Sequence, residues 1–246
     1  MNLSPGPDET LDLFLDGRLQ VLQPKKGYRV SVDTILLSQF IHLRENEKAA
    51  DFGTGCGILP LILSLTSKAR SFVGIEIQKG LAGLARRNIA LNQLECRVSI
   101  VQRNVKELKE VFSPGCFDVV FSNPPYQQCD SGRINPSLEK AIARHEIETT
   151  LHDLIETATY LLPTKGRCYL VYPASRAIDL LVTLRHCRLE PKQLRFVHPG
   201  KGRKAEFILA ESVKHSGTEL KVMEPLFLEP GKDPLTSSRE LINNSM

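Results

Sequence analysis

The sequence predicts an α/β fold built around a doubly wound, mostly parallel sheet. Short apolar runs, typical of strands covered on both faces, alternate with segments whose apolar residues recur at helical spacing. This alternation implies parallel pairing with right-handed crossovers. The last two strand-like runs are joined by a link too short for a helical crossover. They therefore predict an antiparallel pair at one edge of the sheet.

The core is expected to hold seven strands and five helices. Strands are expected at residues 49–52, 72–77, 97–101, 117–122, 166–172, 193–197 and 206–211. Helices are expected at residues 57–65, 78–92, 105–111, 151–162 and 174–187. In the second helix, Leu81, Leu84, Ala85 and Ile89 lie at roughly helical spacing.

Residues 1–48 are interpreted as a short N-terminal extension packed on the core, residues 49–228 as the main domain, and residues 229–246 as a polar tail. In the extension, the Asp-Gly-Arg at 16–18 is a plausible hairpin turn, and Asp33 is placed to cap the helix that follows. A long polar link separates the fourth and fifth strands. Such links are uncommon unless they act as lids or binding loops.

Composition excludes several classes of protein. The 246 residues are 41% apolar and carry a net charge of +4, which is ordinary for a globular chain. No apolar run approaches the roughly 18 residues of a membrane span, and no secretory leader is visible. The six scattered cysteines form no Cys-x-x-Cys pair, which fits reduced thiols in a cytosol. We therefore expect a cytoplasmic protein without a metal and, in the absence of a coiled-coil pattern, a monomer.

A glycine turn follows the first core strand. Gly53, Gly55 and Gly57 are spaced by two residues, which lets the backbone turn sharply and approach a ligand closely. In an open α/β sheet such a turn lies at the carboxyl end of a strand, where ligands bind. The spacing differs from the Gly-x-Gly-x-x-Gly of dinucleotide binding. Asp51, just before the turn, would repel a pyrophosphate but suits an ammonium group.

Two further polar residues follow the next strands. Glu76 ends the second strand, 19 residues after Gly57, where a carboxylate usually accepts both hydroxyls of a ribose. Asn104 follows the third strand, where its oxygen could accept from an adenine amine or could cap the next helix. These features favour S-adenosylmethionine, which has an adenosine and a zwitterionic amino acid but no phosphate. The glycines alone would also fit a helix entry without a ligand.

The fourth strand ends in Asn123-Pro124-Pro125-Tyr126, beside the glycine turn in such a sheet. The prolines stiffen the chain, so the Asn123 carboxamide oxygen and the Pro124 carbonyl become two fixed acceptors. Two acceptors match a planar NH2 group, orient its lone pair and stabilise positive charge as it develops. Tyr126 supplies a ring for stacking a flat substrate. A proline-stiffened turn without chemistry is the alternative interpretation.

Together these motifs resemble the class I S-adenosylmethionine-dependent methyltransferases that act on exocyclic amines. The resemblance implies a Rossmann-like fold: a seven-stranded, mostly parallel sheet with one antiparallel edge strand. A narrower resemblance, to the bacterial tRNA1(Val) adenine-N6 methyltransferase family, runs from about Leu13 to about Leu228 and rests on residues 27–37, 143–146 and 197–205. It implies methylation of the adenine 3′ of the anticodon, with residues 31–33 closing over the cofactor. Asn104 stands where the family usually has an acid.

The predicted cofactor-binding residues combine the motifs with the resemblance: Ser31, Asp33, Asp51, Gly53, Thr54, Gly55, Cys56, Gly57, Glu76, Ile77, Asn104, Val105 and Asn123. The candidate contacts to RNA are basic groups: Lys25, Lys26, Arg29, Arg144, His145, Lys201, Arg203 and Lys204. Either cluster of basic residues could equally be a solvated loop. His145 has no partner at ligand spacing, so no metal site is expected.

The leading prediction is therefore an adenine-N6 methyltransferase that acts on tRNA. A single-stranded anticodon loop lets the target base leave its stack easily. Within the same class, adenine in rRNA or DNA and a protein glutamine stay open as acceptors. Two other classes are a nicotinamide-dependent oxidoreductase, against which the glycine spacing speaks, and a non-catalytic RNA-binding module, against which the intact Asn-Pro-Pro-Tyr speaks.

Overall fold

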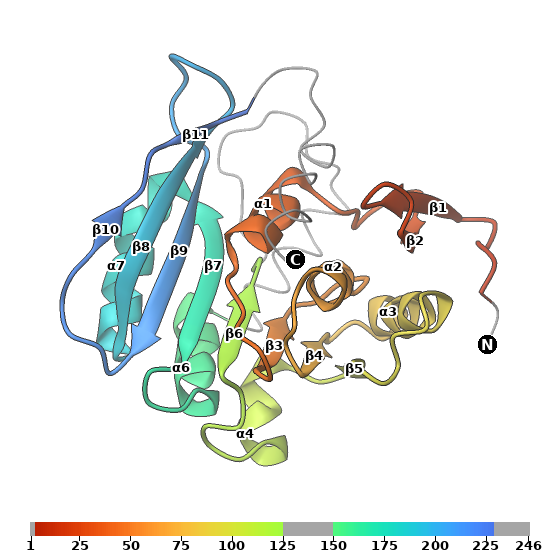
Figure 1. The fold of residues 1–246 in the computed structure, drawn as a ribbon, viewed down its shortest axis with the longest axis horizontal. Coiled ribbons are helices and arrows are strands. Elements are labelled where there is room, and N and C mark those ends of the chain that lie inside the picture. Colours follow the sequence, from red (N-terminus) through yellow and green to blue (C-terminus); the bar gives the residue numbers. More distant parts are fainter. Residues whose placement is uncertain (1–2, 125–149, 229–246) are drawn as a thin grey trace.

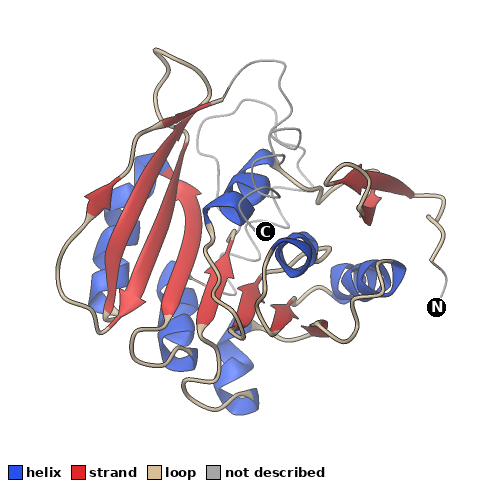
Figure 2. Cartoon of the chain, in the orientation of Figure 1, coloured by secondary structure: helices blue, strands red, loops and turns tan. Residues whose placement is uncertain are grey.

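The computed structural model describes residues 3–124 and 150–228. Its central sheet lies between two layers of helices (Figures 1 and 2). The strand order is β10-β8-β9-β7-β6-β3-β4-β5, with β11 also paired to β8. The strands are β3 (Lys48–Phe52), β4 (Ser71–Ile75), β5 (Val98–Val101), β6 (Val119–Ser122), β7 (Arg167–Pro173), β8 (Leu189–His198), β9 (Phe207–Lys214), β10 (Lys221–Val222) and β11 (Leu226–Phe227).

The two helical layers cover opposite faces of this sheet. The helices are α1 (Val32–Phe40), α2 (Ile58–Thr66), α3 (Lys79–Leu91), η1 (Val105–Glu107), α4 (Leu108–Val111), α6 (Leu151–Leu161), η2 (Ala174–Arg176) and α7 (Ala177–His186). Helices α1, α2 and α3 share one hydrophobic cluster, together with the hairpin of β1 (Glu9–Phe14) and β2 (Leu19–Pro24). Helices α4, α6 and α7 contribute to the other cluster.

Alternation along the strands explains this layering. In β6, Val119 and Phe121 belong to the first cluster, whereas Val120 belongs to the second, and all three are fully buried. A strand with apolar residues at successive positions buries both faces, because successive side chains point to opposite sides of the sheet. The predicted doubly wound α/β sheet is confirmed.

The sheet differs from the expected one at its far edge. The predicted antiparallel pair is present as β8 and β9, but β9, which runs antiparallel to both of its neighbours, lies inside the sheet between β7 and β8 and not at its edge. Its apolar run Phe207–Ala210 is buried throughout, which suits an inner strand, whereas β8 alternates buried and half-buried residues, as an outer strand does. The short strands β10 and β11 then pair in parallel with β8 and extend the sheet beyond seven strands.

The N-terminal hairpin packs against the first helical layer. Leu19, Val21 and Leu22 of the hairpin are fully buried against the first helical layer. The predicted cap of the next helix is wrong, because α1 begins at Val32 and Asp33 already lies within its first turn. No helix in the described ranges is long and apolar enough to span a bilayer.

Candidate methyl-transfer site

The predicted site residues meet at the carboxyl edge of the sheet. Phe52, the last residue of β3, is in register with the last residues of β4 and β6. The residue that follows each of these strands is Gly53 after β3, Glu76 after β4 and Asn123 after β6. These three residues therefore lie side by side at the carboxyl edge. This edge faces α1 and the connection to α2 (Figure 1). Parallel strands thus bring three motifs that lie far apart in the sequence to one place.

The glycine turn is held tightly against β4. The backbone N–H groups of Gly53 and Thr54 both donate to the Ile75 carbonyl, at 2.9 Å each. Gly55 has a φ of +59° and Gly57 a φ of +87°, in the left-handed region that L side chains rarely adopt. The turn therefore requires glycine at these positions. Gly57 leads directly into α2, as the sequence predicts.

Glu76 is fixed over this turn. Its carboxylate accepts from the Gly55 N–H at 2.9 Å and from the Gln78 N–H at 2.8 Å, and the residue is only 5% exposed. Charge-assisted bonds from backbone groups define the position of a carboxylate well. The contact of Glu76 to a ribose stays a prediction. Ile77, the next residue in the chain, is half-buried beside it.

Asp51 is a buried carboxylate whose oxygens have no hydrogen-bond partner among the described residues, and the same holds for the Thr54 hydroxyl. Burial raises the pKa of Asp51 to about 7; the nearby Thr54 hydroxyl lowers this pKa, and the charge of Glu76 raises it. Buried charges are normally paired. An orphaned carboxylate beside a glycine turn therefore fits a ligand with an ammonium group, as in the amino-acid end of S-adenosylmethionine.

Tyr28 closes over the glycine turn and is a site residue that the sequence analysis did not single out. A Cβ placed on Gly55 would lie 2.4 Å from the Tyr28 Cζ, so the ring rests directly on the turn. The residue is 37% exposed as a whole, yet its hydroxyl end points inward. Burial and the nearby charges, among them Asp51 and Glu76, hold the Tyr28 pKa well above its usual range. The available signal was its place in residues 27–37, one of the segments on which the family resemblance rests.

Asn123 has a defined orientation. Its Nδ2 donates to Asp33 Oδ2 at 3.1 Å and to Thr34 Oγ1 at 2.8 Å, both on the first turn of α1. Ser122, just before it, anchors the end of β6 by donating to the Phe52 carbonyl at 2.6 Å. Pro124 follows and is buried. Of the predicted catalytic motif, Pro125 and Tyr126 lie outside the described residues, as do Arg144 and His145 of the long link.

The remaining predicted cofactor residues have distinct environments. Asn104 caps the short helix η1, since its Oδ1 accepts from the Lys106 N–H at 3.0 Å. The capping interpretation of Asn104 is thus confirmed, and its contact to an adenine stays a prediction. Val105 is half-buried next to it. Cys56 is fully buried, and burial raises the pKa of its thiol to about 12, so it is no nucleophile at neutral pH.

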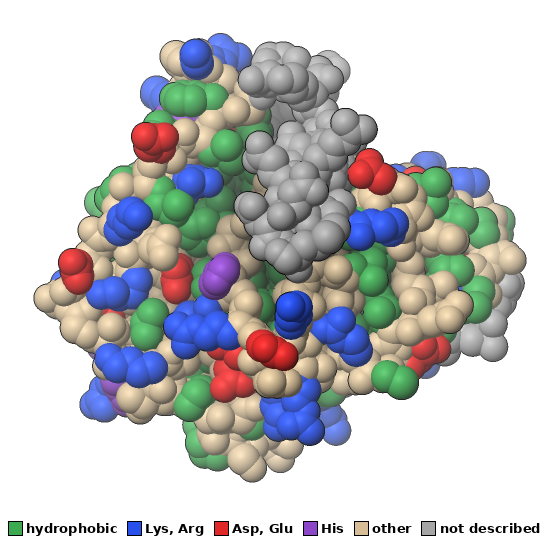
Figure 3. All heavy atoms as spheres, viewed as in Figure 1, with side chains coloured by type: hydrophobic (Ala, Val, Ile, Leu, Met, Phe, Trp, Pro, Cys, Tyr) green, Lys and Arg blue, Asp and Glu red, His purple; other side chains and the backbone are tan. Residues whose placement is uncertain are grey.

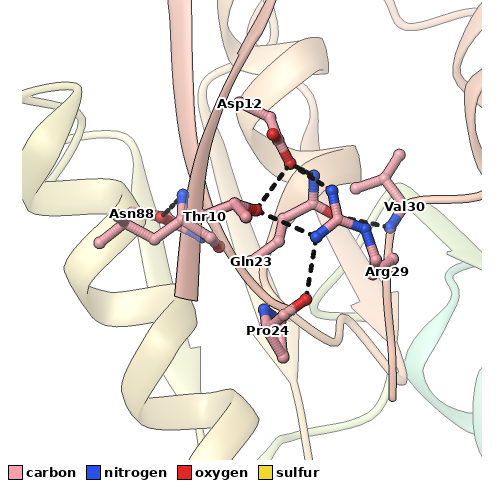
Figure 4. Close-up of polar contacts among 8 residues, drawn as sticks. Thr10, Asp12, Gln23, Pro24, Arg29, Val30 and Asn88 are labelled. Atoms are coloured by element: carbon pink, nitrogen blue, oxygen red, sulfur yellow. Dashed lines mark hydrogen bonds and ion pairs between the residues drawn. The ribbon is translucent and has the colours of Figure 1, made fainter. Parts of the chain in front are cut away.

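The Arg29 guanidinium is directed into the extension (Figure 4), and its contact to RNA stays a prediction. Its guanidinium donates to Thr10 Oγ1 at 3.0 Å and to the Pro24 carbonyl at 2.9 Å. It also forms an ion pair with Asp12 at 2.7 Å. The Arg29 guanidinium thus donates to three partners on the hairpin. Arg29 therefore joins the hairpin to the segment that carries Tyr28.

Gln23 makes a second connection in the same network (Figure 4). This buried side chain donates to Asp12 Oδ2 at 2.6 Å and accepts from the Val30 N–H at 2.7 Å. Val30 lies just before α1, whose first turn contacts Asn123. The hairpin thus fixes where α1 begins.

Asn88 on α3 and Asn92, the C-cap of α3, hold the hairpin, and Asn88 also ties it to the glycine turn. Asn88 accepts from the Leu22 N–H at 2.7 Å and donates to the Leu22 carbonyl at 3.0 Å, and it also donates to the Cys56 carbonyl at 2.9 Å. Asn92, one turn later, pairs with Gln20 in the same way, at 2.9 and 2.7 Å. The two carboxamides thus satisfy the backbone N–H and carbonyl groups along the outer edge of β2, as a neighbouring strand would.

The second basic cluster lies at the same edge of the sheet as the site. Lys201, Arg203 and Lys204 are exposed in the connection from β8 to β9, where Lys and Arg side chains gather at the top of the surface in Figure 3. The His198 ring braces this connection by bonding to the Arg203 carbonyl at 2.8 Å. In the first cluster, the Lys25 ammonium donates to the Pro7 carbonyl and Lys26 is exposed.

No group of three or more His, Cys, Asp or Glu residues within the described ranges could hold a metal ion.

Comparison with known families decides the class of the protein. The model of the methyltransferase small domain family matches residues 28–185, from Tyr28 over the glycine turn to the end of α7. The chain belongs to this family. Membership confirms the predicted activity, methyl transfer, with S-adenosylmethionine as the methyl donor. It speaks against the oxidoreductase alternative.

Two relatives and two solved structures place the chain further. A Porphyromonas gingivalis tRNA1(Val) (adenine(37)-N6)-methyltransferase is 29% identical over 206 residues, covering 81% of this chain and 80% of the relative. Its counterpart from Aeromonas salmonicida is 28% identical over 169 residues, covering 68% and 69%. A predicted O-methyltransferase of Agrobacterium tumefaciens superposes with a TM-score of 0.65 at 20% identity, covering 87% and 96%. Pyrococcus horikoshii TYW2, in complex with MeSAdo, superposes with a TM-score of 0.58 at 13% identity, covering 86% and 73%. The two structures confirm the Rossmann-like methyltransferase fold.

Proposed function

We propose that this methyltransferase modifies the exocyclic N6 of an adenine in tRNA, namely the adenine 3′ of the anticodon of a valine tRNA. The orientation of Asn123 carries the proposal: its NH2 end is held by α1, so its oxygen is left to accept from a substrate amine. The names of the relatives support tRNA as the acceptor. The same relatives support a cytoplasmic location for the proposed reaction.

The residues of this chain supply alignment. S-adenosylmethionine, when bound, supplies a methyl group activated by a sulfonium that leaves as a neutral thioether. Asp51 and Glu76 match its ammonium and ribose hydroxyls, which fixes the direction in which the methyl group faces. The Asn123 oxygen and the Pro124 carbonyl accept hydrogen bonds from the two N–H groups of the adenine amine, and one of these protons is lost to water once the nitrogen carries the methyl group. These bonds strengthen as the nitrogen becomes positive, so they stabilise the transition state more than the ground state.

The basic connection between β8 and β9 is the proposed contact to tRNA phosphates. Lys201, Arg203 and Lys204 are exposed on the same edge as the site. Each phosphate contact contributes to the slope of binding affinity against salt concentration. Replacing all three by Ala should weaken tRNA binding and reduce that slope by about 2–3. Lys68 and Arg70 are exposed just before β4, at the opposite edge, and the control for a Lys201 and Arg203 double replacement is the replacement of these two residues by Ala.

The acceptor is tested with methyl-labelled S-adenosylmethionine and a panel of substrates: tRNA and ribosomes from a strain lacking this protein, duplex DNA, and release factors. Each labelled product is digested and identified by mass spectrometry. Label in tRNA as N6-methyladenosine supports the proposal. Label confined to rRNA, DNA adenine or a protein glutamine would replace it with the corresponding alternative. Cofactor binding with no label in any substrate would favour a non-catalytic RNA-binding module.

A further inference from the structure

The contact between α1 and Asn123 decides which end of the Asn123 carboxamide faces the site. Asp33 is 6% exposed and Thr34 is 2% exposed, so both partners of the amide are buried. The Thr34 hydroxyl can donate or accept, so it does not distinguish the two ends of an amide. The Asp33 carboxylate can only accept. The amide nitrogen must therefore face Asp33, and the oxygen must face away from it.

We propose that Asp33 is a positioning residue that orients the Asn123 carboxamide for catalysis. The inference rests on the proposed function in one respect, because it takes the Asn123 oxygen as the acceptor of a substrate hydrogen. It replaces the earlier prediction that Asp33 closes over the cofactor. Asp33 acts through Asn123 and touches neither reactant.

An unheld carboxamide has two orientations of similar energy that differ by a rotation of its end group. In the wrong one, its NH2 group faces the NH2 group of the substrate, and two donors meet without an acceptor. A bond to a carboxylate is worth roughly tenfold to a hundredfold in such an equilibrium. Further bonds hold the two acceptors in place. The Asp33 Oδ1 accepts from the Thr34 N–H at 3.0 Å, and the Ser31 and Thr34 hydroxyls lie 3.1 Å apart.

The first test reads the bond itself, without any substrate or cofactor. In protein labelled with 15N-asparagine, the Asn123 side-chain amide is identified as the NMR signal absent from Asn123→Asp. We expect slow hydrogen exchange at this amide in the wild type and fast exchange in Asp33→Leu, which keeps the size of the side chain but removes the acceptor. Slow exchange that persists in Asp33→Leu would overturn the assignment.

The second test separates orientation from cofactor binding. For Asp33→Leu we expect kcat to fall about ten- to a hundredfold, while the affinity for S-adenosylhomocysteine in calorimetry stays within about threefold. Weakened S-adenosylhomocysteine binding with unchanged kcat at saturation would make Asp33 a cofactor ligand and overturn the proposal. The isosteric Asp33→Asn variant guards against misfolding, because it can still accept from Asn123. It should therefore retain more activity than Asp33→Leu.

A reversed pair gives the strictest control. Asn123→Asp alone sets two carboxylates against each other and should lower kcat. Asp33→Asn combined with Asn123→Asp lets residue 33 donate and residue 123 accept, so one oxygen again faces the substrate. We expect the double variant to recover at least about tenfold in kcat over Asn123→Asp. No recovery would contradict a role in orientation. If the wild type labels none of the substrates, the proposed function fails, whereas the exchange measurement still decides the orientation.

Discussion

Replacing Asn88 tests how the N-terminal hairpin holds the glycine turn. Asn88 is fully buried and pairs with three backbone groups, the N–H and carbonyl of Leu22 and the carbonyl of Cys56. Asn88→Ala leaves all three groups without this partner in a place that water reaches poorly. Asn92 makes the matching pair with Gln20 at the surface, where water can replace it. Asn88 thus differs from Asn92 in its burial and in its third partner, the Cys56 carbonyl of the glycine turn.

Each buried backbone group left without a hydrogen bond costs about 1–3 kcal/mol. For the three groups around Asn88, with partial relaxation, we expect a loss of about 4 kcal/mol in the free energy of unfolding. In a chain of this size that loss lowers Tm by about 8–16 °C. Asn92→Ala should cost about 1 kcal/mol, because its partners stay hydrated.

The assay is equilibrium unfolding in urea followed by circular dichroism, with linear extrapolation to water. Asn88→Ala should also weaken binding of S-adenosylhomocysteine, because Cys56 belongs to the turn, whereas Asn92→Ala should not. Losses of stability that agree within about 0.5 kcal/mol for the two variants would refute the reasoning, since additivity and error are of that size.

Two further predictions concern the turn itself. Gly55→Ala places a side chain at a φ of +59° and against the Tyr28 ring, so we expect it to lower stability by about 2 kcal/mol or more. In a Tyr28→Ala background only the backbone strain of about 1 kcal/mol should remain, and an equal loss in both backgrounds, measured by thermal unfolding, would rule out the contact. Because burial raises the Asp51 pKa to about 7, the folded state binds more protons than the unfolded state between about pH 4 and pH 7. Stability from this group is therefore lost as pH rises through that window, so the stability of Asp51→Asn should rise relative to that of the wild type between about pH 4 and pH 7. The affinity for S-adenosylhomocysteine should rise over the same interval only in the wild type, and parallel pH profiles would show that Asp51 does not titrate there.

The parts of the fold that the sequence predicts are those with a local signal. Apolar runs and glycine spacing locate the core strands and the turn, and parallel pairing then brings Glu76 and Asn123 to the same edge. The sequence shows less clearly where each strand lies within the sheet. The burial of β9 on both faces depends on which strands it inserts between, and a pattern of residues shows burial but not neighbours.

The missed contacts are side-chain bonds across long sequence separations. Asp33 was expected to cap the helix, yet it lies within the first turn of α1 and its carboxylate accepts from Asn123, 90 residues away, a tertiary bond that no local pattern shows. Asn88 pairs with Leu22 over 66 residues, and no periodicity marks such a pair. Arg29 was interpreted from its charge alone, and its three partners on the hairpin appear only in the folded chain.

The central claim is that the Asn123 oxygen accepts from the amine that is methylated. The most direct measurement is a single-turnover reaction of wild type and Asn123→Ala with methyl-labelled S-adenosylmethionine and tRNA from a strain lacking this protein. We predict N6-methyladenosine in the wild-type product, a rate about 10²–10³ lower for Asn123→Ala, and S-adenosylhomocysteine affinities within about threefold of each other. Equal rates for the two proteins on the same tRNA would contradict the account.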